Sequence, residues 1–226
     1  MRRDTAGPGQ LLVIAKAPVP GQVKTRLCPP CTPRQAARLA AAALADTLAA
    51  VRSTPASRRI LVLAGALAMA PTGIDLLPQR GAGLADRLVA AYLDTAEPGV
   101  PSFLIGMDTP QLTPGLLAVA LRRLRDADAV LGLAADGGWW GLGLRDARHA
   151  EALRGVPMST AETGMATFAA LAARGLRIAG LPVLRDVDTI ADARAVAALA
   201  PRTRFAAAVA RLRPVGAVPG SKPAAG

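Results

Sequence analysis

Apolar residues fall along the chain into short runs that alternate with longer amphipathic segments. Short runs bounded by glycine, proline or polar residues predict buried strands, and apolar residues that recur every three or four positions predict helices. On these patterns we predict strands at residues 11–15, 59–64, 74–78, 102–106, 129–134, 139–144 and 176–184. We predict helices at residues 33–51, 83–95, 114–125, 161–173 and 190–199, followed by a basic helix after residue 201.

Threonine N-caps mark the starts of three of these helices, at Thr32, Thr113 and Thr189. The first two threonines precede a proline, which suits the first helical position because its missing N–H would have no partner there. In the helix predicted at 83–95, one face carries the apolar residues 84, 88, 91 and 92.

Strands that alternate with helices predict a mostly parallel sheet with helices on both faces, which is an α/β fold. A length of 226 residues fits a single domain. We place this domain at residues 11–200, with an extension at 1–10 and a basic helix and disordered tail at 201–226. Ligands of such sheets bind outside the carboxyl ends of the strands. Asp108 and the loop that starts at Lys16 both lie at such ends, so they are the first candidates for a site.

Composition limits the classes of protein to which the chain can belong. No run of about 18 or more uncharged apolar residues occurs, so no membrane span is predicted, and the apolar run at 11–15 is too short for a signal peptide. We therefore expect a cytoplasmic protein. The net charge of +11 suggests nucleic acid or an anionic membrane surface as a partner, and of these we expect no membrane partner. However, only 3% of residues are aromatic and the arginines are spread over many predicted helices, which argues against nucleic-acid binding.

The loop after the first predicted strand has an unusual charge pattern. Just three of the 27 basic residues are lysines, and two of them, Lys16 and Lys24, lie in this loop together with Arg26. Lysine and arginine side chains both bind phosphate oxygens, so we predict that the loop wraps a polyphosphate. The loop has neither the Walker A pattern nor the dinucleotide fingerprint. A solvated basic loop is the alternative.

Cys28 and Cys31 form the only cysteine pair, and His149 is the sole histidine. A zinc site requires further cysteine or histidine ligands. We therefore interpret the pair as a proline-rich turn that carries two thiols, with a redox or metal role as the alternative. Carboxylates, lysine and arginine must carry the chemistry of the chain.

Four segments of the chain occur in the same order and at similar spacing in a known family. They are residues 16–27 (KAPVPGQVKTRL), 106–112 (GMDTPQL), 136–144 (DGGWWGLGL) and 186–189 (DVDT). From about residue 11 to 199 the chain resembles the GT-A-type transferases named arsenosugar-biosynthesis glycosyltransferases or radical-SAM/selenodomain-associated transferases. That family is similar to nucleotide-diphospho-sugar transferases and to the molybdenum-cofactor and phospholactate nucleotidylyltransferases. The resemblance implies a GT-A-like, Rossmann-like fold.

The resemblance also implies a donor site. Lys16, Lys24 and Arg26 would bind the phosphates of a nucleotide. Asp108 would hold the Mg²⁺ or Mn²⁺ ion that bridges the diphosphate, because oxygen ligands that face phosphates suit these ions. Asp188 is the predicted second metal ligand, and a helix-capping role is its alternative.

Asp136 is predicted to orient or deprotonate the acceptor, and with Arg26 it forms the predicted catalytic pair. Gly137 and Gly138 would let a substrate approach the backbone. A plain hairpin turn is the alternative for Asp136, because its glycines permit positive φ angles.

Other segments match the family less closely. Arg87 is a candidate phosphate ligand, but it follows Asp86 where the family tends to have glutamate, which puts a base or ribose contact from Asp86 in doubt. Residues 157–160 lack the tryptophan that the family often shows there, and they also suit a helix cap. Trp139 and Trp140 replace the usual tyrosines, and strand alternation predicts that one of them points to the core.

These residues predict a metal-dependent glycosyltransferase that moves a sugar from a nucleotide-diphospho-sugar donor to a small-molecule acceptor. The same residues would serve a nucleotidylyltransferase, in which a phosphorylated or phosphonylated small molecule attacks an NTP. A non-catalytic nucleic-acid-binding or scaffold protein is the second alternative, and it predicts steep salt dependence and no need for Asp108. The sequence leaves the donor, the acceptor and the oligomeric state open.

Overall fold

The seven predicted strands form one sheet in the computed structural model, which describes residues 9–212. The strands are β1 (Gln10–Lys16), β2 (Arg59–Ala64), β3 (Asp75–Pro78), β4 (Ser102–Ile105), β5 (Ala129–Ala134), β6 (Trp139–Leu144) and β7 (Ile178–Leu184), and their order in the sheet is β3-β2-β1-β4-β6-β5-β7. Neighbouring strands are parallel except in the two pairs that β6 makes, with β4 and β5. A tight turn joins β5 to β6, and such a turn can join only antiparallel strands. The sheet is mostly parallel, as predicted.

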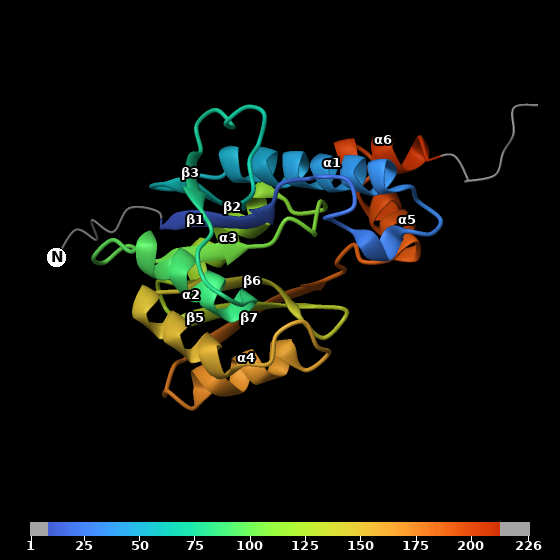
Figure 1. The fold of residues 1–226 in the computed structure, drawn as a ribbon. Coiled ribbons are helices and arrows are strands. Elements are labelled where there is room, and N and C mark those ends of the chain that lie inside the picture. Colours follow the sequence, from blue (N-terminus) through green and yellow to red (C-terminus); the bar gives the residue numbers. More distant parts are fainter. Residues whose placement is uncertain (1–8, 213–226) are drawn as a thin grey trace, which may run out of the picture.

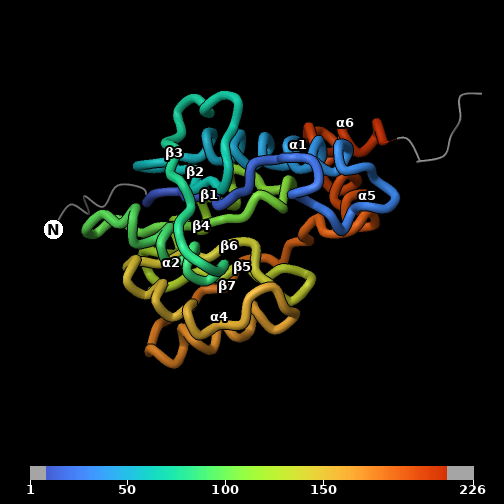
Figure 2. Tube along the Cα trace, viewed as in Figure 1, coloured from blue at the N-terminus to red at the C-terminus, as the bar shows by residue number. Residues whose placement is uncertain are grey.

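Helices cover both faces of this sheet (Figure 1). They are α1 (Pro33–Arg52), α2 (Leu84–Asp94), α3 (Pro114–Arg123), α4 (Thr163–Ala172), α5 (Ile190–Leu199) and α6 (Arg204–Ala210), with two 3₁₀ segments, η1 (Thr25–Leu27) and η2 (Ala147–Gly155). The first face carries α1 and α3, and the second carries α2, α4 and η2. At one end of the sheet, α5 and α6 pack on α1 beside the loop that follows β1 (Figures 1 and 2).

Successive residues of β1 point to opposite faces of the sheet, so both faces need apolar side chains. Leu11 and Val13 belong to the core shared with α1, whereas Leu12 belongs to the core shared with α2. All three side chains are fully buried. Burial of each leucine contributes about 1.5–3 kcal/mol. This two-sided burial explains why β1, an inner strand of the sheet, has a continuous apolar run rather than an alternating pattern.

Capping boxes fix the starts of two helices that flank the site. The Thr32 hydroxyl accepts from the Gln35 N–H (3.2 Å), and the Gln35 side chain accepts from the Thr32 N–H (2.7 Å), at the start of α1. Thr189 and Asp192 make the same reciprocal pair at the start of α5, at 3.0 and 3.2 Å. Because Thr189 is the cap, the preceding Asp188 is left free of a capping role.

Three local details differ from the predictions. Leu84 is 44% exposed and does not share the buried face of its helix, because it is the first residue of α2 and lines a cavity. The helix α4 begins at Thr163 rather than residue 161, because the Thr163 hydroxyl accepts from the Thr160 N–H (3.1 Å) and holds the preceding turn. The segment η2 was not predicted, and Asp146 caps it by accepting from the Arg148 N–H.

The ends of the chain are only partly described. The predicted basic helix corresponds to α6, whereas most of the predicted extension and the predicted disordered tail lie outside residues 9–212. Within residues 9–212, no helix is long and apolar enough to span a bilayer.

Candidate functional site

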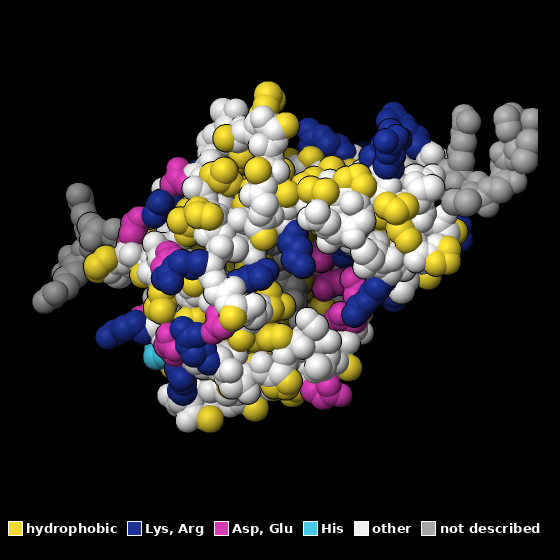
Figure 3. Space-filling model, in the orientation of Figure 1, with side chains coloured by type: hydrophobic (Ala, Val, Ile, Leu, Met, Phe, Trp, Pro, Cys, Tyr) yellow, Lys and Arg dark blue, Asp and Glu magenta, His cyan; other side chains and the backbone are white. Residues whose placement is uncertain are grey.

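A cavity of about 510 Å³ opens at the carboxyl ends of the parallel strands. Its walls come from the end of β1 and the loop after it, the loop after β4, the β5–β6 turn, the β7–α5 segment, α2 and the start of α4. Basic and acidic side chains meet at this hollow in the surface (Figure 3). The charged residues that line it are Lys16, Lys24, Arg26, Arg87, Asp108, Asp136, Asp186 and Asp188. The fold thus brings all seven predicted site residues to one cavity and adds Asp186.

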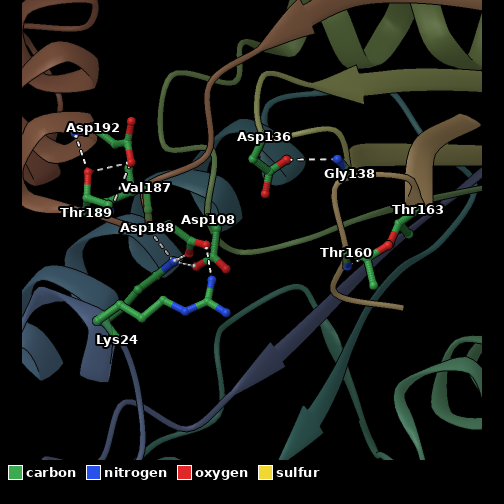
Figure 4. Close-up of polar contacts among 11 residues, drawn as sticks. Lys24, Asp108, Asp136, Gly138, Thr160, Thr163, Val187, Asp188, Thr189 and Asp192 are labelled. Carbon is green, nitrogen blue, oxygen red and sulfur yellow. Dashed lines mark hydrogen bonds and ion pairs between the residues drawn. The ribbon is translucent and has the colours of Figure 1, made fainter. Parts of the chain in front are cut away.

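Lys24 lies at the centre of a cluster of oxygen atoms (Figure 4). Its Nζ lies 2.9 Å from Asp108 Oδ1 and 3.3 Å from Asp188 Oδ1, and it donates to the backbone carbonyl of Val187. The Lys24 side chain is only 10% exposed. Its backbone has φ 50° and ψ 38°, in the left-handed region that is uncommon for residues other than glycine. One ammonium therefore joins the loop after β1, the loop after β4 and the β7–α5 segment.

The other cations of the cavity differ in their partners. Arg26 Nη1 lies 2.9 Å from Asp188 Oδ2, so Asp188 is paired with two cations. Lys16 and Arg87 also line the cavity, but neither makes an ion pair within residues 9–212, and Arg87 donates to a backbone carbonyl. Lys24 and Arg26 are therefore held by carboxylates, while Lys16 and Arg87 are available to an anion.

The β5–β6 turn places Asp136 in the cavity wall, apart from the Lys24 cluster (Figure 4). Its Oδ1 accepts from the Gly138 N–H at 2.9 Å, so the carboxylate stabilises the turn and faces the cavity as well. Gly137 has φ 89°, and a Cβ atom there would overlap the backbone carbonyl of Ala161, in the turn that precedes α4. Glycine is therefore required at residue 137.

Asp186 is the acidic residue that the sequence analysis did not select. Burial, and after it the negative charges of Asp136 and Asp108, together raise the pKa of the Asp186 carboxyl to about 7. Its Oδ1 is buried without a hydrogen-bond partner in the described structure. The available signal was its spacing from Asp188, because residues two apart in an extended segment point to the same side.

The oxygen ligands of the cavity fit a hard divalent cation. Among residues 9–212, no group of three or more His, Cys, Asp or Glu side chains is arranged to hold a metal. Asp108 and Asp188 nevertheless reach one common cation, because the Lys24 Nζ lies within 3.3 Å of both. The unpartnered Oδ1 of Asp186 is a further oxygen in the same cavity. An all-oxygen set of this kind suits Mg²⁺ or Mn²⁺.

The two tryptophans take different places, as strand alternation predicts. Trp140 is 2% exposed and packs edge-on against Phe103, with ring centroids 5.9 Å apart. Trp139 is half-buried and packs against the core of the opposite face of the sheet, and both tryptophans line the cavity. Asp86 is outside the cavity and pairs with Arg154, so it is not a site residue.

Cys28 and Cys31 are free thiols in the loop before α1, and neither lines the cavity. Burial raises the pKa of the Cys31 thiol. A buried thiol with a raised pKa is a poor nucleophile and metal ligand. This geometry favours the interpretation of the pair as part of a structural turn.

A mostly parallel sheet with cations and carboxylates at its carboxyl edge defines the class: the chain has a GT-A-like fold, which it shares with nucleotide-diphospho-sugar transferases. Within that class, the chain belongs to the bacterial family DUF2064, described as "Uncharacterized protein conserved in bacteria". The family model matches residues 36–160, which is more than half of the chain. No curated protein matches the chain significantly.

Solved structures agree with this fold. A "putative nucleotide-diphospho-sugar transferase" from Desulfovibrio desulfuricans is 25% identical, with a TM-score of 0.82, over 90% of this chain and 94% of its own. The 2-C-methyl-D-erythritol 4-phosphate cytidylyltransferase from Thermus thermophilus is 19% identical, with a TM-score of 0.54, over 85% and 98%. A Mycobacterium tuberculosis protein in complex with manganese is 24% identical, with a TM-score of 0.52, over 83% and 97%.

Proposed function

We propose that the chain is a divalent-metal-dependent glycosyltransferase that uses a nucleotide-diphospho-sugar donor and a small-molecule acceptor. The observation that carries the proposal is the meeting of four cations and four carboxylates in one cavity at the carboxyl edge of the sheet. A nucleoside diphosphate needs cations for its phosphates, and an acceptor hydroxyl needs a carboxylate. The similarity to the Desulfovibrio desulfuricans protein supports the choice of donor.

The basic side chains of the cavity would bind and neutralise the diphosphate. Lys16 and Arg87 have no carboxylate partner within the described residues, so their charges are available to phosphate oxygens. Arg26 is 72% exposed and can turn from Asp188 to the donor at little cost, because an exposed ion pair contributes only about 0.2–1 kcal/mol. These groups stabilise the charge that grows on the leaving nucleoside diphosphate.

The acidic side chains would divide into two roles. Asp108 and Asp188 would hold Mg²⁺ or Mn²⁺, which supplies positive charge to the diphosphate when it is bound. Asp136 lies apart from this pair and is fixed by its bond from the Gly138 N–H, so it would orient the acceptor hydroxyl and accept its proton. Trp139, on the same cavity wall, would contact the acceptor.

Nucleotidyl transfer is the second candidate function. The observation in its favour is that two cations, Lys16 and Arg87, make no ion pair within residues 9–212, which would suit the longer triphosphate of an NTP. The fold of the Thermus thermophilus cytidylyltransferase is compatible with it.

Within glycosyl transfer, the arsenosugar-biosynthesis family that the motifs resemble supports a small hydroxylated metabolite as the acceptor.

A thermal-shift panel separates these functions, because a ligand that binds only the folded state raises the melting temperature. The purified protein is measured with NTPs, NDPs and nucleotide sugars, each with Mg²⁺, with Mn²⁺ and with EDTA. Metal-dependent stabilisation by a nucleotide sugar is the expected result and identifies the donor. Stabilisation by an NTP without its sugar conjugates favours nucleotidyl transfer. No stabilisation by any member of the panel contradicts both.

A further inference from the structure

The Lys24 ammonium occupies the position in which a metal ion would contact Asp108 and Asp188. Two carboxylate oxygens and one backbone carbonyl surround its Nζ, at 2.9 Å from Asp108, 3.3 Å from Asp188, and in hydrogen-bond contact with Val187. A set of oxygen ligands that carries two negative charges is a typical coordination environment of a divalent cation. The ammonium and a metal ion therefore compete for the same oxygens.

We propose that Lys24 is an internal counter-ion that closes the Asp108–Asp188 site until a divalent cation displaces it, and that the released ammonium then binds the phosphates of the nucleotide. This inference rests on the proposed function, because it assumes a metal and a phosphorylated donor at this cavity. It adds an order to binding: metal and nucleotide each bind weakly alone and strengthen each other.

The burial of Lys24 is the reason for this coupling. The Lys24 side chain is 10% exposed, whereas the Asp108 and Asp188 side chains are 40% and 35% exposed. The buried ammonium is therefore the group that is most costly to leave without a counter-charge. When Lys24 leaves, Asp188 keeps its pair with Arg26, but Asp108 has no other cation partner within residues 9–212 and attracts a replacement cation. The buried Lys24 ammonium in turn needs another anion. A metal ion meets the first need and a diphosphate meets the second.

The local backbone shows that this arrangement is specific to Lys24. Lys24 adopts a left-handed conformation, with φ 50°, and directly precedes η1, whose Leu27 is fully buried against α1 and α5. Lys16 enters the same cavity from the end of β1, is exposed and makes no ion pair within residues 9–212. Lys16 is therefore a matched control that carries the same charge in the same cavity without occupying the oxygen cluster.

The first test is the affinity for Mn²⁺ alone, measured by calorimetry for the wild type, Lys24→Met and Lys16→Met. Loss of any positive charge near the site strengthens cation binding, and Lys16→Met measures that general effect. We expect Lys24→Met to bind Mn²⁺ at least about tenfold more tightly than Lys16→Met, within the 5–150-fold range usual for coupled sites. Equal affinities in the two variants would overturn the proposal.

The second test needs no variant, so it stands even if Lys24→Met fails to fold. The chain has three lysines, and acetylation of each can be followed by peptide mass spectrometry. We expect Mn²⁺ to raise the labelling of Lys24 relative to Lys16 by at least about fivefold, and pyrophosphate added with Mn²⁺ to lower it again. An unchanged labelling ratio in the presence of saturating Mn²⁺ would overturn the proposal.

The two failures are distinguishable. If Mn²⁺ and a nucleotide sugar bind together but neither test responds to Lys24, the counter-ion role is wrong and the proposed function stands. If Mn²⁺ binds neither the wild type nor Lys24→Met, with or without a nucleotide sugar, the metal-dependent function is wrong and this inference is overturned with it.

Discussion

Asp186 gives the chain a pH-dependent stability that a single substitution should remove. The carboxyl has a pKa of about 7 in the folded protein, well above its ordinary value of 3.8, chiefly because it is buried. Between these two values the folded state keeps a proton that the unfolded state releases, so unfolding becomes easier as the pH rises from about 4 to about 7. Above pH 7 the folded protein bears the full cost of a buried carboxylate. Asp186→Asn cannot ionise and avoids this cost.

The size of the effect follows from the pKa difference. About three pKa units at ~1.4 kcal/mol each give an upper limit of ~4 kcal/mol. The Asp186 side chain is partly exposed to solvent, and solvent screening lowers the electrostatic cost of its charge. We therefore expect a destabilisation of about 1–2 kcal/mol from the ionised carboxylate. The unfolding free energy of Asp186→Asn relative to the wild type should therefore be about 1–2 kcal/mol higher at pH 8 than at pH 4.5.

The assay is urea unfolding of both proteins at pH 4.5 and pH 8 in EDTA, which keeps divalent ions away from the carboxylates. Asp136→Asn is a cross-check, because the Asp136 charge is the second largest cause of the raised pKa and its removal should shrink the pH effect of Asp186. If the stability difference between the wild type and Asp186→Asn is the same at both pH values, the burial argument is wrong.

Three further predictions concern the walls of the site. Gly137→Ala should lower the unfolding free energy by about 2 kcal/mol or more in urea titrations, because its φ of 89° and the Ala161 carbonyl exclude a Cβ atom; an unchanged midpoint would contradict this. Trp140→Ala should cost about 3–5 kcal/mol in the same assay, because it opens a cavity beside Phe103, and a loss under 1 kcal/mol would mean that the ring is not packed. Asp136→Asn keeps the oxygen that accepts from the Gly138 N–H, so donor affinity should change less than about twofold while turnover falls by about 100-fold or more; normal turnover would remove Asp136 from the mechanism.

Much of the fold could be predicted from local sequence. Continuous apolar runs identify strands buried on both faces, and threonine caps such as Thr32 and Thr189 identify helix starts, because these signals depend on a few neighbouring residues. The segment η2 escaped prediction, since its short 3₁₀ turns leave no regular apolar period. The tight turn after β5 indicates an antiparallel β5–β6 pair, but the pairing of β6 with β4 is a choice of strand partner that sequence pattern does not encode.

Seven of the eight charged residues of the candidate site were predicted from the sequence, but their pairings were not. Lys16, Lys24 and Asp108 were predicted because they follow the carboxyl ends of predicted strands, and the carboxyl ends of parallel strands lie at one edge of a sheet. The ion pair of Lys24 with Asp108 joins residues far apart in sequence, so it depends on the packing of the loop after β1. Asp186 was passed over for the same reason, because the burial of its Oδ1 arises only when separate segments close around it.

Metal-dependent binding of the donor by Asp108 is the central claim. Calorimetric titration of a nucleotide sugar selected by the thermal-shift panel is carried out in Mn²⁺ and in EDTA, with the wild type, Asp108→Asn and the control Asp75→Asn. Asp75 is an exposed partner of Arg58 outside the cavity. We predict that the wild type and Asp75→Asn bind at least about tenfold more tightly in Mn²⁺ than in EDTA, and that Asp108→Asn loses this difference. Equal Mn²⁺ dependence in all three proteins would contradict the account.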